Sequence, residues 1–291
     1  MDIQSLSVVV PNKECMNKCP FCVSRMVNSN IYPNLLDLSH PTYDYNIKEY
    51  MRRLKYVADA GCQTLMLTGT SEPQQNKQFL NTFALIHRLI GKPFTNIEMQ
   101  TTGVLLDKNP DYLRFLKNFV GINTIAISLN SVSEEMNNKL LGNYINVKKL
   151  CQDLKSYGFN IRICCNLSKL FDLDCNPWEN IFKHFKDELH ADQVTLRTLY
   201  ASEKETEQSA WISENFFDAE QQLRLVSYMK HQPTIGRTMY GAVKYSIMEM
   251  SVICDTDCMG KNAMNNTLKY LILRPNCHLY SQWDSPASLV F

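Results

Sequence analysis

The chain has 291 residues, 45% of them hydrophobic, and its 30 basic and 29 acidic residues leave a formal net charge of +1. This length allows a large buried core, and the near-neutral charge does not support non-specific nucleic-acid binding or a polybasic membrane-binding surface. No run of about 18 apolar residues predicts a transmembrane helix, and the N-terminus does not resemble a signal peptide. We therefore expect a cytoplasmic protein whose 11 cysteines are mostly reduced.

Short apolar runs alternate with amphipathic stretches through the first 231 residues. The first run, at 6–10, predicts a strand, and the stretch at 46–61 predicts a helix that ends at Gly61. Five more strands are expected at 62–69, 95–103, 123–131, 160–168 and 193–200, and five more helices at 77–90, 110–119, 146–158, 177–190 and 218–231. Repeated strand–helix units predict an α/β fold with a parallel sheet. Six units suit a partial (β/α)6 TIM-like barrel better than a closed eight-stranded one.

The last 60 residues have a different pattern. Segments 237–255 and 268–283 are rich in β-forming residues, and Pro275-Asn276 before Cys277 is typical of a turn between two strands. No linker rich in Pro, Gly or Ser precedes them. We therefore predict a barrel domain at 1–232 and a β-rich C-terminal extension at 233–291, which packs on the barrel as an antiparallel unit.

Three cysteines stand within eight positions in the segment ECMNKCPFCVS, residues 14–24. Cys15, Cys19 and Cys22 have the spacing C-x3-C-x2-C and follow the first expected strand. Ligand sites on parallel α/β folds lie at the C-terminal ends of the strands, so this loop is well placed to bind one. Thiolates suit iron–sulfur clusters, zinc or copper(I). Because no clean fourth ligand stands nearby, a cluster with one open iron fits better than a zinc site.

The spacing, the aromatic Phe21 and the position after the first strand resemble the radical S-adenosylmethionine (SAM) enzymes. In that family three cysteines hold a [4Fe-4S] cluster, and the amino and carboxylate groups of SAM chelate the fourth iron. Reduction of the cluster cleaves SAM to methionine and a 5′-deoxyadenosyl radical, which abstracts hydrogen from a substrate. The resemblance implies that Cys15, Cys19 and Cys22 are the cluster ligands, that Phe21 shields the cluster, and that a flavodoxin- or ferredoxin-like protein donates the electron.

Further segments resemble the family's cofactor-binding segments. Residues 69–73, GTSEP, resemble the Gly-Gly-Glu-Pro turn that contacts the SAM amino group, and TTG at 101–103 resembles a Thr-Asn-Gly segment. Polar residues near the ends of the fourth and fifth strands match positions that bind the ribose or the methionine carboxylate. The resemblance assigns cofactor binding to Phe21, Gly69, Thr70, Ser71, Glu72, Thr102, Ser128, Asn130 and Asn166.

Two further sets of residues are candidates for other roles. Arg197 on the sixth strand is a candidate catalytic residue that either pairs with a ligand carboxylate or phosphate or forms a structural salt bridge. Some radical SAM enzymes bind a second cluster in the C-terminal region, and Cys254, Cys258 and Cys277 are the candidates here. Their spacing, C-x3-C-x18-C, departs from the usual C-x2-C pairs. Alternatively, Cys277 is exposed in its turn near the barrel mouth and donates a hydrogen atom to a product radical.

These observations predict a radical SAM enzyme that uses a [4Fe-4S] cluster and S-adenosyl-L-methionine. The sequence has no peptide-recognition module before Cys15 and no added nucleic-acid domain, which favours a small molecule or nucleotide as substrate. The alternatives are a peptide- or RNA-modifying radical SAM enzyme, and a non-catalytic scaffold that holds an iron–sulfur cluster or zinc. The substituted Gly-Gly-Glu turn favours the scaffold.

Overall fold

The computed structural model describes residues 2–26, 31–106, 109–171, 177–200, 205–255, 263–264 and 266–291. Its central feature is a sheet of eleven strands. In spatial order these are β14 (Leu279–Tyr280), β13 (Leu271–Leu273), β2 (Leu6–Val10), β3 (Thr64–Gly69), β4 (Asn96–Thr101), β5 (Thr124–Leu129), β6 (Asn160–Leu167), β7 (Gln193–Thr198), β10 (Met250–Asp255), β9 (Val243–Ile247) and β8 (Thr234–Arg237).

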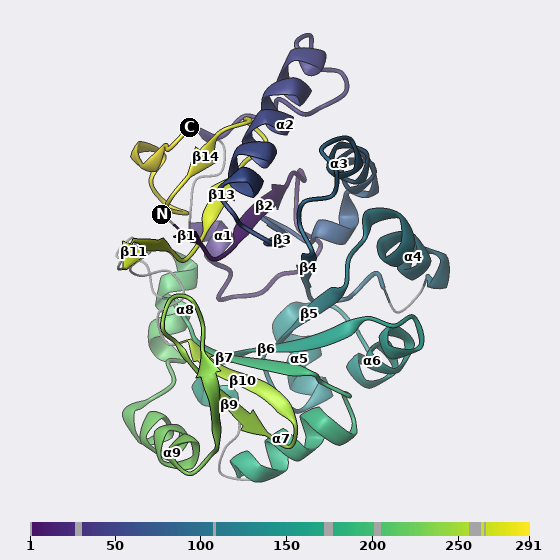
Figure 1. Cartoon of the computed structure of the whole chain (residues 1–291). Coiled ribbons are helices and arrows are strands. Elements are labelled where there is room, and N and C mark those ends of the chain that lie inside the picture. The colour runs from purple at the N-terminus through teal and green to yellow at the C-terminus, as the bar shows by residue number, and fades with distance from the viewer. Residues whose placement is uncertain are drawn as a thin grey trace.

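The six strands from β2 to β7 pair in parallel in chain order, as the sequence predicts. The α/β class with a large parallel sheet is therefore confirmed. The sheet is strongly curved, but its described strands end in β14 on one side and β8 on the other, so the strand order does not show a closed barrel (Figure 1). A small second sheet joins β1 (Asp2–Ile3), β12 (Thr267–Leu268) and β11 (Ala263–Met264).

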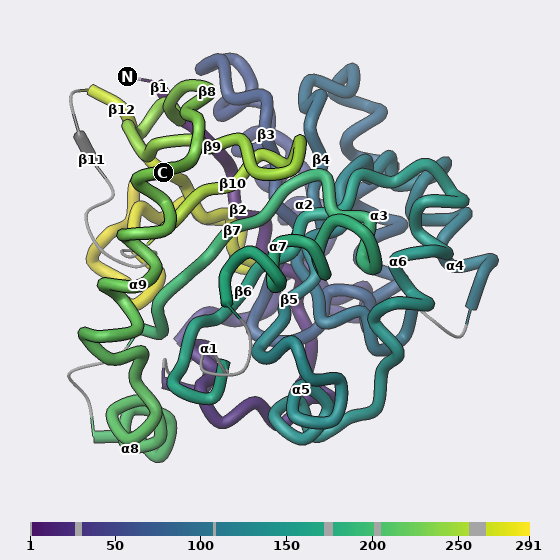
Figure 2. Tube along the Cα trace, turned by 90° about the horizontal axis from the view of Figure 1, so that it is seen from below, coloured from purple at the N-terminus to yellow at the C-terminus, as the bar shows by residue number. Residues whose placement is uncertain are grey.

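Helices cover the outer side of the curved sheet (Figures 1 and 2). The described helices are α1 (Val23–Met26), α2 (Tyr43–Asp59), α3 (Lys77–Leu89), α4 (Pro110–Arg114), α5 (Glu134–Leu141), α6 (Val147–Ser156), α7 (Trp178–Asp187), α8 (Glu207–Glu214) and α9 (Ala219–Lys230). Among these helices, none combines the length and the apolar composition needed to cross a membrane. The sequence predicts six of them and misses the short helices α1, α5 and α8. A π-helical segment, Phe115–Val120, continues α4.

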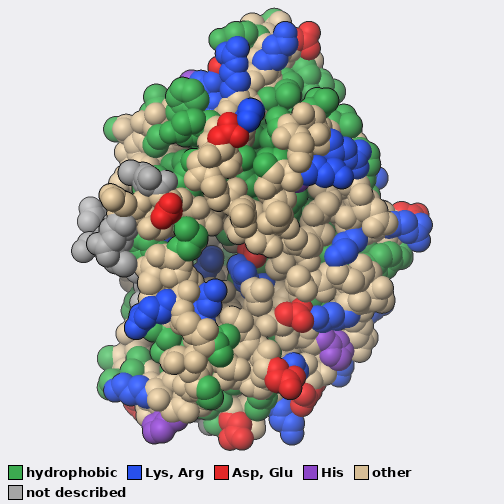
Figure 3. Space-filling model, viewed as in Figure 1, with side chains coloured by type: hydrophobic (Ala, Val, Ile, Leu, Met, Phe, Trp, Pro, Cys, Tyr) green, Lys and Arg blue, Asp and Glu red, His purple; other side chains and the backbone are tan. Residues whose placement is uncertain are grey.

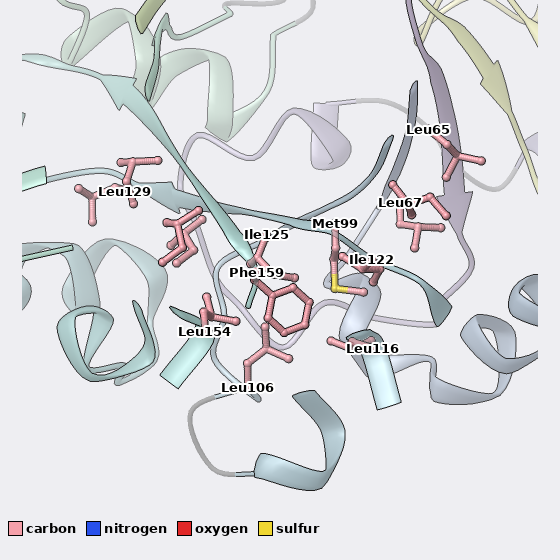
Figure 4. Packing of buried hydrophobic residues seen from close by; sticks show 14 of the residues in the cluster. Leu65, Leu67, Met99, Leu106, Leu116, Ile122, Ile125, Leu129, Leu154 and Phe159 are labelled. Carbon is pink, nitrogen blue, oxygen red and sulfur yellow. The ribbon is translucent and has the colours of Figure 1, made fainter. Parts of the chain in front are cut away.

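The main hydrophobic core lies between the sheet and these helices. Every described helix except α1 and α8 contributes one face, such as Val147, Leu150, Cys151 and Leu154 of α6, at the spacing that helical periodicity requires. Figure 4 shows Met99 and Ile125, from adjacent strands, close to Phe159 in this core. Alternate strand residues point to the other side of the sheet, and on β6 these are Arg162, Cys164 and Asn166. The inner face is therefore polar, and it lines a cavity.

The C-terminal segment extends both edges of the sheet. β10 pairs in parallel with β7, and β9 and β8 continue from it in antiparallel order. At the other edge β13 pairs in parallel with β2, and the β13–β14 hairpin turns where the sequence predicts. The expectation of a wholly antiparallel extension is therefore wrong for β10 and β13. Strand composition predicts extended structure but does not determine strand direction, which depends on the path of the connecting chain.

Candidate cofactor and substrate cavity

A cavity of about 930 Å³ lies inside the curved sheet. It reaches from the cysteine loop, at the C-terminal ends of the strands, to Gln4 and Ser5, which precede β2. Ligand sites in proteins measure roughly 300–1,000 Å³, so this cavity has room for a cofactor together with a small substrate. The structure brings these predicted residues together in its lining: Cys15, Cys19, Phe21, Cys22, Gly69, Thr70, Ser71, Glu72, Thr102, Ser128, Asn130, Asn166, Arg197 and Cys254.

The cysteine loop is held by hydrogen bonds from segments far away in the chain. The backbone N–H of Met16 donates to Gln75 Oε1 at 3.0 Å, and that of Lys18 donates to the Leu141 carbonyl at 2.8 Å. Asn143 donates to the Met16 carbonyl and to Asn17 Oδ1, each at 2.8 Å. The loop therefore has a defined conformation supported by α5 and by the segment after β3.

The three thiols lie half-buried and close enough to interact electrostatically. Burial raises the pKa of Cys19 to about 12, and the negative charges that Cys22 and Cys15 carry as thiolates contribute to this rise. Burial also raises the pKa of Cys15. Phe21 packs against Trp211 of α8, with ring centroids 5.5 Å apart, and contributes to an apolar cluster in contact with Cys19. A cationic centre bound here would stabilise the thiolates that burial and mutual repulsion disfavour.

Within the described part of the chain, no group of three or more His, Cys, Asp or Glu residues has the arrangement needed to hold a metal ion. A single zinc ion requires its ligands to converge on one point about 2.3 Å from each sulfur. A four-iron cluster separates its thiolates more widely, because each binds a different iron. Either centre would take its ligands from Cys15, Cys19 and Cys22, and all three line one cavity.

Glu72 is the centre of a buried hydrogen-bond network. Its Oε1 accepts from Asn17 Nδ2 at 2.9 Å and from the Thr102 N–H at 3.0 Å, and its Oε2 accepts from Gln74 Nε2 at 2.8 Å and from the Thr101 hydroxyl. Its carboxylate is thus satisfied by uncharged donors and fixes the cysteine loop relative to β4. The sequence predicts Glu72 and Thr102 in the site but misses Asn17, Gln74 and Thr101. The only sequence signal for these three residues is that they stand next to predicted motif residues.

The turn before Glu72 lies against the end of β2. A side chain at Gly69 would place its Cβ 2.8 Å from the Val10 carbonyl oxygen, so only glycine permits the two strands to approach this closely. The neighbouring Ser71 lines the cavity, and its buried hydroxyl has no hydrogen-bond partner among the described residues. Buried hydroxyls are normally paired, so this one indicates a position where a bound ligand would supply the partner.

Two asparagines link the ends of β5 and β6. Asn166 Nδ2 donates to Asn130 Oδ1 at 2.9 Å, and the Asn130 N–H donates to Asn137 Oδ1 of α5 at 3.0 Å. Ser128, on the same face of β5, also lines the cavity. These side chains present hydrogen-bonding groups at the cysteine end, where a ribose or carboxylate would be bound.

The cavity also contains charged residues that the sequence motifs do not include. On β6, the half-buried Arg162 forms an ion pair with the buried Glu98 of β4 at 2.6 Å. Lys269, just before β13, pairs with Asp255 at the end of β10 at 3.1 Å. Alternation along a strand could have identified Arg162, because it shares a face with Asn166. Arg197 is in register with Asn166 on one side and with Asp255 on the other.

Cys277 corrects one prediction. It occupies the β13–β14 turn with a φ of +63°, as expected, but its side chain is only 4% exposed. Its thiol donates to the Asn46 carbonyl of α2 at 3.3 Å and packs in the main core, where burial raises its pKa to about 12. The expected exposure near the barrel mouth is therefore wrong. Cys254 also packs against the core, and Cys258 lies outside the described residues.

The comparisons with known proteins bear on this geometry. The sequence model of the Radical SAM superfamily matches residues 9–171, which include the cysteine loop and strands β3 to β6. No curated protein matches the chain significantly. Among solved structures, a mutant O-GlcNAc hydrolase from Thermobaculum terrenum matches with 11% identity and a TM-score of 0.31. The match covers 53% of this chain and 38% of the hydrolase, a likeness too weak to support any conclusion.

Proposed function

The chain belongs to the radical SAM superfamily, and on that premise we propose that it is an enzyme that cleaves SAM reductively and transfers the radical to a small molecule or nucleotide. Cys15, Cys19 and Cys22 would hold the [4Fe-4S] cluster, and a flavodoxin- or ferredoxin-like protein would supply the electron. When bound, the cluster would supply the electron for reductive cleavage of SAM, and the protein's residues would hold the substrate for hydrogen abstraction. We also propose that strands β2 to β7 form a partial (β/α)6 barrel and that residues 233–291 form its β-rich C-terminal cap, whose strands extend the two edges of the sheet.

One observation carries the proposal: three thiols and the buried Glu72 network lie at one end of a cavity large enough for a cofactor and a substrate. The protein's own residues would orient the cofactor and exclude water while the cofactor carries out the radical step. Ser71, with its unpartnered buried hydroxyl, and the Asn130–Asn166 pair provide hydrogen-bonding groups beside the thiols. Phe21 and Trp211 would cover the cluster on its apolar side.

Anaerobic reconstitution tests the proposal against a non-catalytic scaffold. The protein would be loaded with iron and sulfide, reduced with dithionite and incubated with SAM. We expect the charge-transfer absorbance of an iron–sulfur cluster and the formation of 5′-deoxyadenosine. A protein that binds zinc with four ligands and leaves SAM intact would overturn the proposal.

A further inference from the structure

The walls of the cavity carry an excess of positive charge. Five basic side chains line it: Arg162, Arg197, Lys244, Lys269 and Arg274. Three carboxylates accompany them, because Glu72 and Asp255 line the cavity and Glu98 bonds to Arg162. Figure 3 shows Lys and Arg side chains in and around the hollow at the middle of this face. Charges of one sign on the walls of a concave site reinforce one another and attract the opposite charge.

Two of these cations are neutralised within the protein. Arg162 pairs with Glu98, and its Nε and Nη2 also donate to Gln193 Oε1, at 2.9 and 2.6 Å. Lys269 pairs with Asp255 across the gap between β10 and the segment before β13. These two pairs fix the shape of the cavity wall.

Lys244 on β9 is a cation whose charge no described carboxylate compensates. Its neighbour Tyr245 packs against the main core, so by the alternation of strand residues Lys244 faces the cavity. It is half-buried, and its ammonium group has no hydrogen bond or ion pair with any described residue. An unpaired cation on the wall of a concave site attracts an anion that enters it.

The position of Lys244 separates it from the cofactor end. It is in register with Ile253 of β10, which is in register with Thr195, two residues before Arg197 on β7. Lys244 therefore lies level with Thr195, two residues farther from the cysteine loop than Arg197 along the strand direction. Arg197, Lys244, Lys269 and Arg274 all follow residue 171, outside the segment that the superfamily model matches. These four basic residues therefore lie in the part of the chain that the superfamily model does not describe, where residues specific to this protein's substrate are expected.

We propose that the cavity binds an anionic small molecule whose phosphate or carboxylate group contacts Lys244. Anion binding can be measured without turnover, so the anion site does not depend on the proposed function. Only the statement that the bound anion is then a substrate rests on the proposed function. The bond to be attacked would lie toward the cysteine loop, and the anionic group would anchor the opposite end of the molecule. Remote anchoring of this kind orients the reacting atoms and reduces the freedom lost in the transition state.

Titration calorimetry on the reconstituted, SAM-bound protein tests this inference with inorganic pyrophosphate and, separately, succinate as probes. We expect at least one probe to bind, and which one binds distinguishes phosphate from carboxylate. Lys244→Gln should weaken binding about tenfold or more, since a charge-assisted hydrogen bond is lost. Lys244→Arg should retain most of the affinity. Lys230→Gln, which removes the same charge from an exposed position on α9, should bind like the unaltered protein.

Failure of both probes to bind the unaltered protein, or equal binding by the Lys244→Gln variant, would overturn the inference. The same samples are assayed for 5′-deoxyadenosine so that the two proposals are judged separately. Cleavage of SAM without Lys244-dependent anion binding leaves the proposed function standing and rejects the anion site. Lys244-dependent binding without SAM cleavage supports the anion site and contradicts the proposed function.

Discussion

Asn17, between Cys15 and Cys19, donates a hydrogen bond to the Glu72 carboxylate at 2.9 Å and another to the Thr102 hydroxyl at 3.0 Å. All three side chains are buried. The contact joins the cysteine loop to the loops after β3 and β4, so three segments that are distant in the sequence share one polar centre. Because every member is hydrogen-bonded, the network adds rigidity, and removing one member leaves the others unsatisfied.

The first prediction concerns Glu72. Glu72→Ala removes the acceptor for four buried donors, and we expect the free energy of unfolding to fall by roughly 3 kcal/mol. Urea unfolding followed by circular dichroism measures the change. Glu14→Ala, at an exposed position in the same region, should change stability by no more than about 0.5 kcal/mol. Equal stability of the two variants would mean that the network does not hold the loop.

The second prediction compares two cysteines. Cys19→Ala should reduce the iron bound per chain and abolish 5′-deoxyadenosine formation, because a cluster ligand is lost. Cys151 is fully buried in the core on α6, so Cys151→Ala should keep the cluster and the activity. Iron analysis and chromatography of the reaction products measure both. Near-normal turnover in the Cys19 variant would end its assignment as a ligand.

The third prediction concerns Gly103, which follows Thr102 with a φ of +86°. A Cβ there would lie 2.3 Å from Leu150 Cδ2 and 3.1 Å from Ile145 Cδ1. Gly103→Ala therefore combines backbone strain with overpacking, and we expect it to destabilise the protein by roughly 2–4 kcal/mol. Gly61→Ala is the matched control, since Gly61 has a φ of +87° but no described atom lies within 4 Å of the position that a Cβ would occupy.

For Gly61→Ala only the strain remains, so we expect a loss of about 1–2 kcal/mol. Thermal and urea unfolding of the two variants separate strain from crowding. If both lost the same stability, the packing of Leu150 against the Gly103 turn would not matter.

Much of the central fold follows from local sequence patterns. Runs such as residues 6–10 and 193–198 are apolar on the side that faces the helices, and the helices between them bury one stripe. These patterns predict strands, helices and the end of the sheet where the cysteine loop lies. They do not predict the direction of β10 and β13, because strand direction is set by pairing with β7 and β2, which are distant in the chain.

The site was predictable where chemistry is concentrated in a short motif. Cys15, Cys19, Cys22 and Glu72 stand in recognisable segments, and the structure places all four on one cavity. Strand alternation places Arg162 on the face of Asn166, but neither its pairing with Glu98 nor the position of Lys244 in the cavity was predictable, because both depend on how the sheet curves. Cys277 shows the same limit: a turn position suggests exposure, but α2 packs over this turn and buries the thiol.

The fourth prediction concerns pH. His87 is buried between Phe83 and Phe94, with ring centroids 5.8 Å away on each side, and its Nε2 accepts a hydrogen bond from the Phe94 N–H at 3.3 Å. Burial, helped by the nearby charge of Lys92, lowers the pKa of His87 to about 4. In the unfolded chain a histidine titrates near pH ~6.5. Between these two values the unfolded state binds the extra proton.

Stability from His87 is therefore complete above pH ~6.5 and falls as the pH decreases toward the folded-state pKa, by about 1.4 kcal/mol per unit. We expect a loss of roughly 2 kcal/mol between pH 7 and pH 5 from this residue. His87→Gln removes the titrating group, so its unfolding free energy, measured with urea at pH 7, 6 and 5, should vary less with pH. His231→Gln, at an exposed position, should keep the original dependence. Identical pH dependence in the His87 variant and the unaltered protein would show that His87 does not couple folding to protonation.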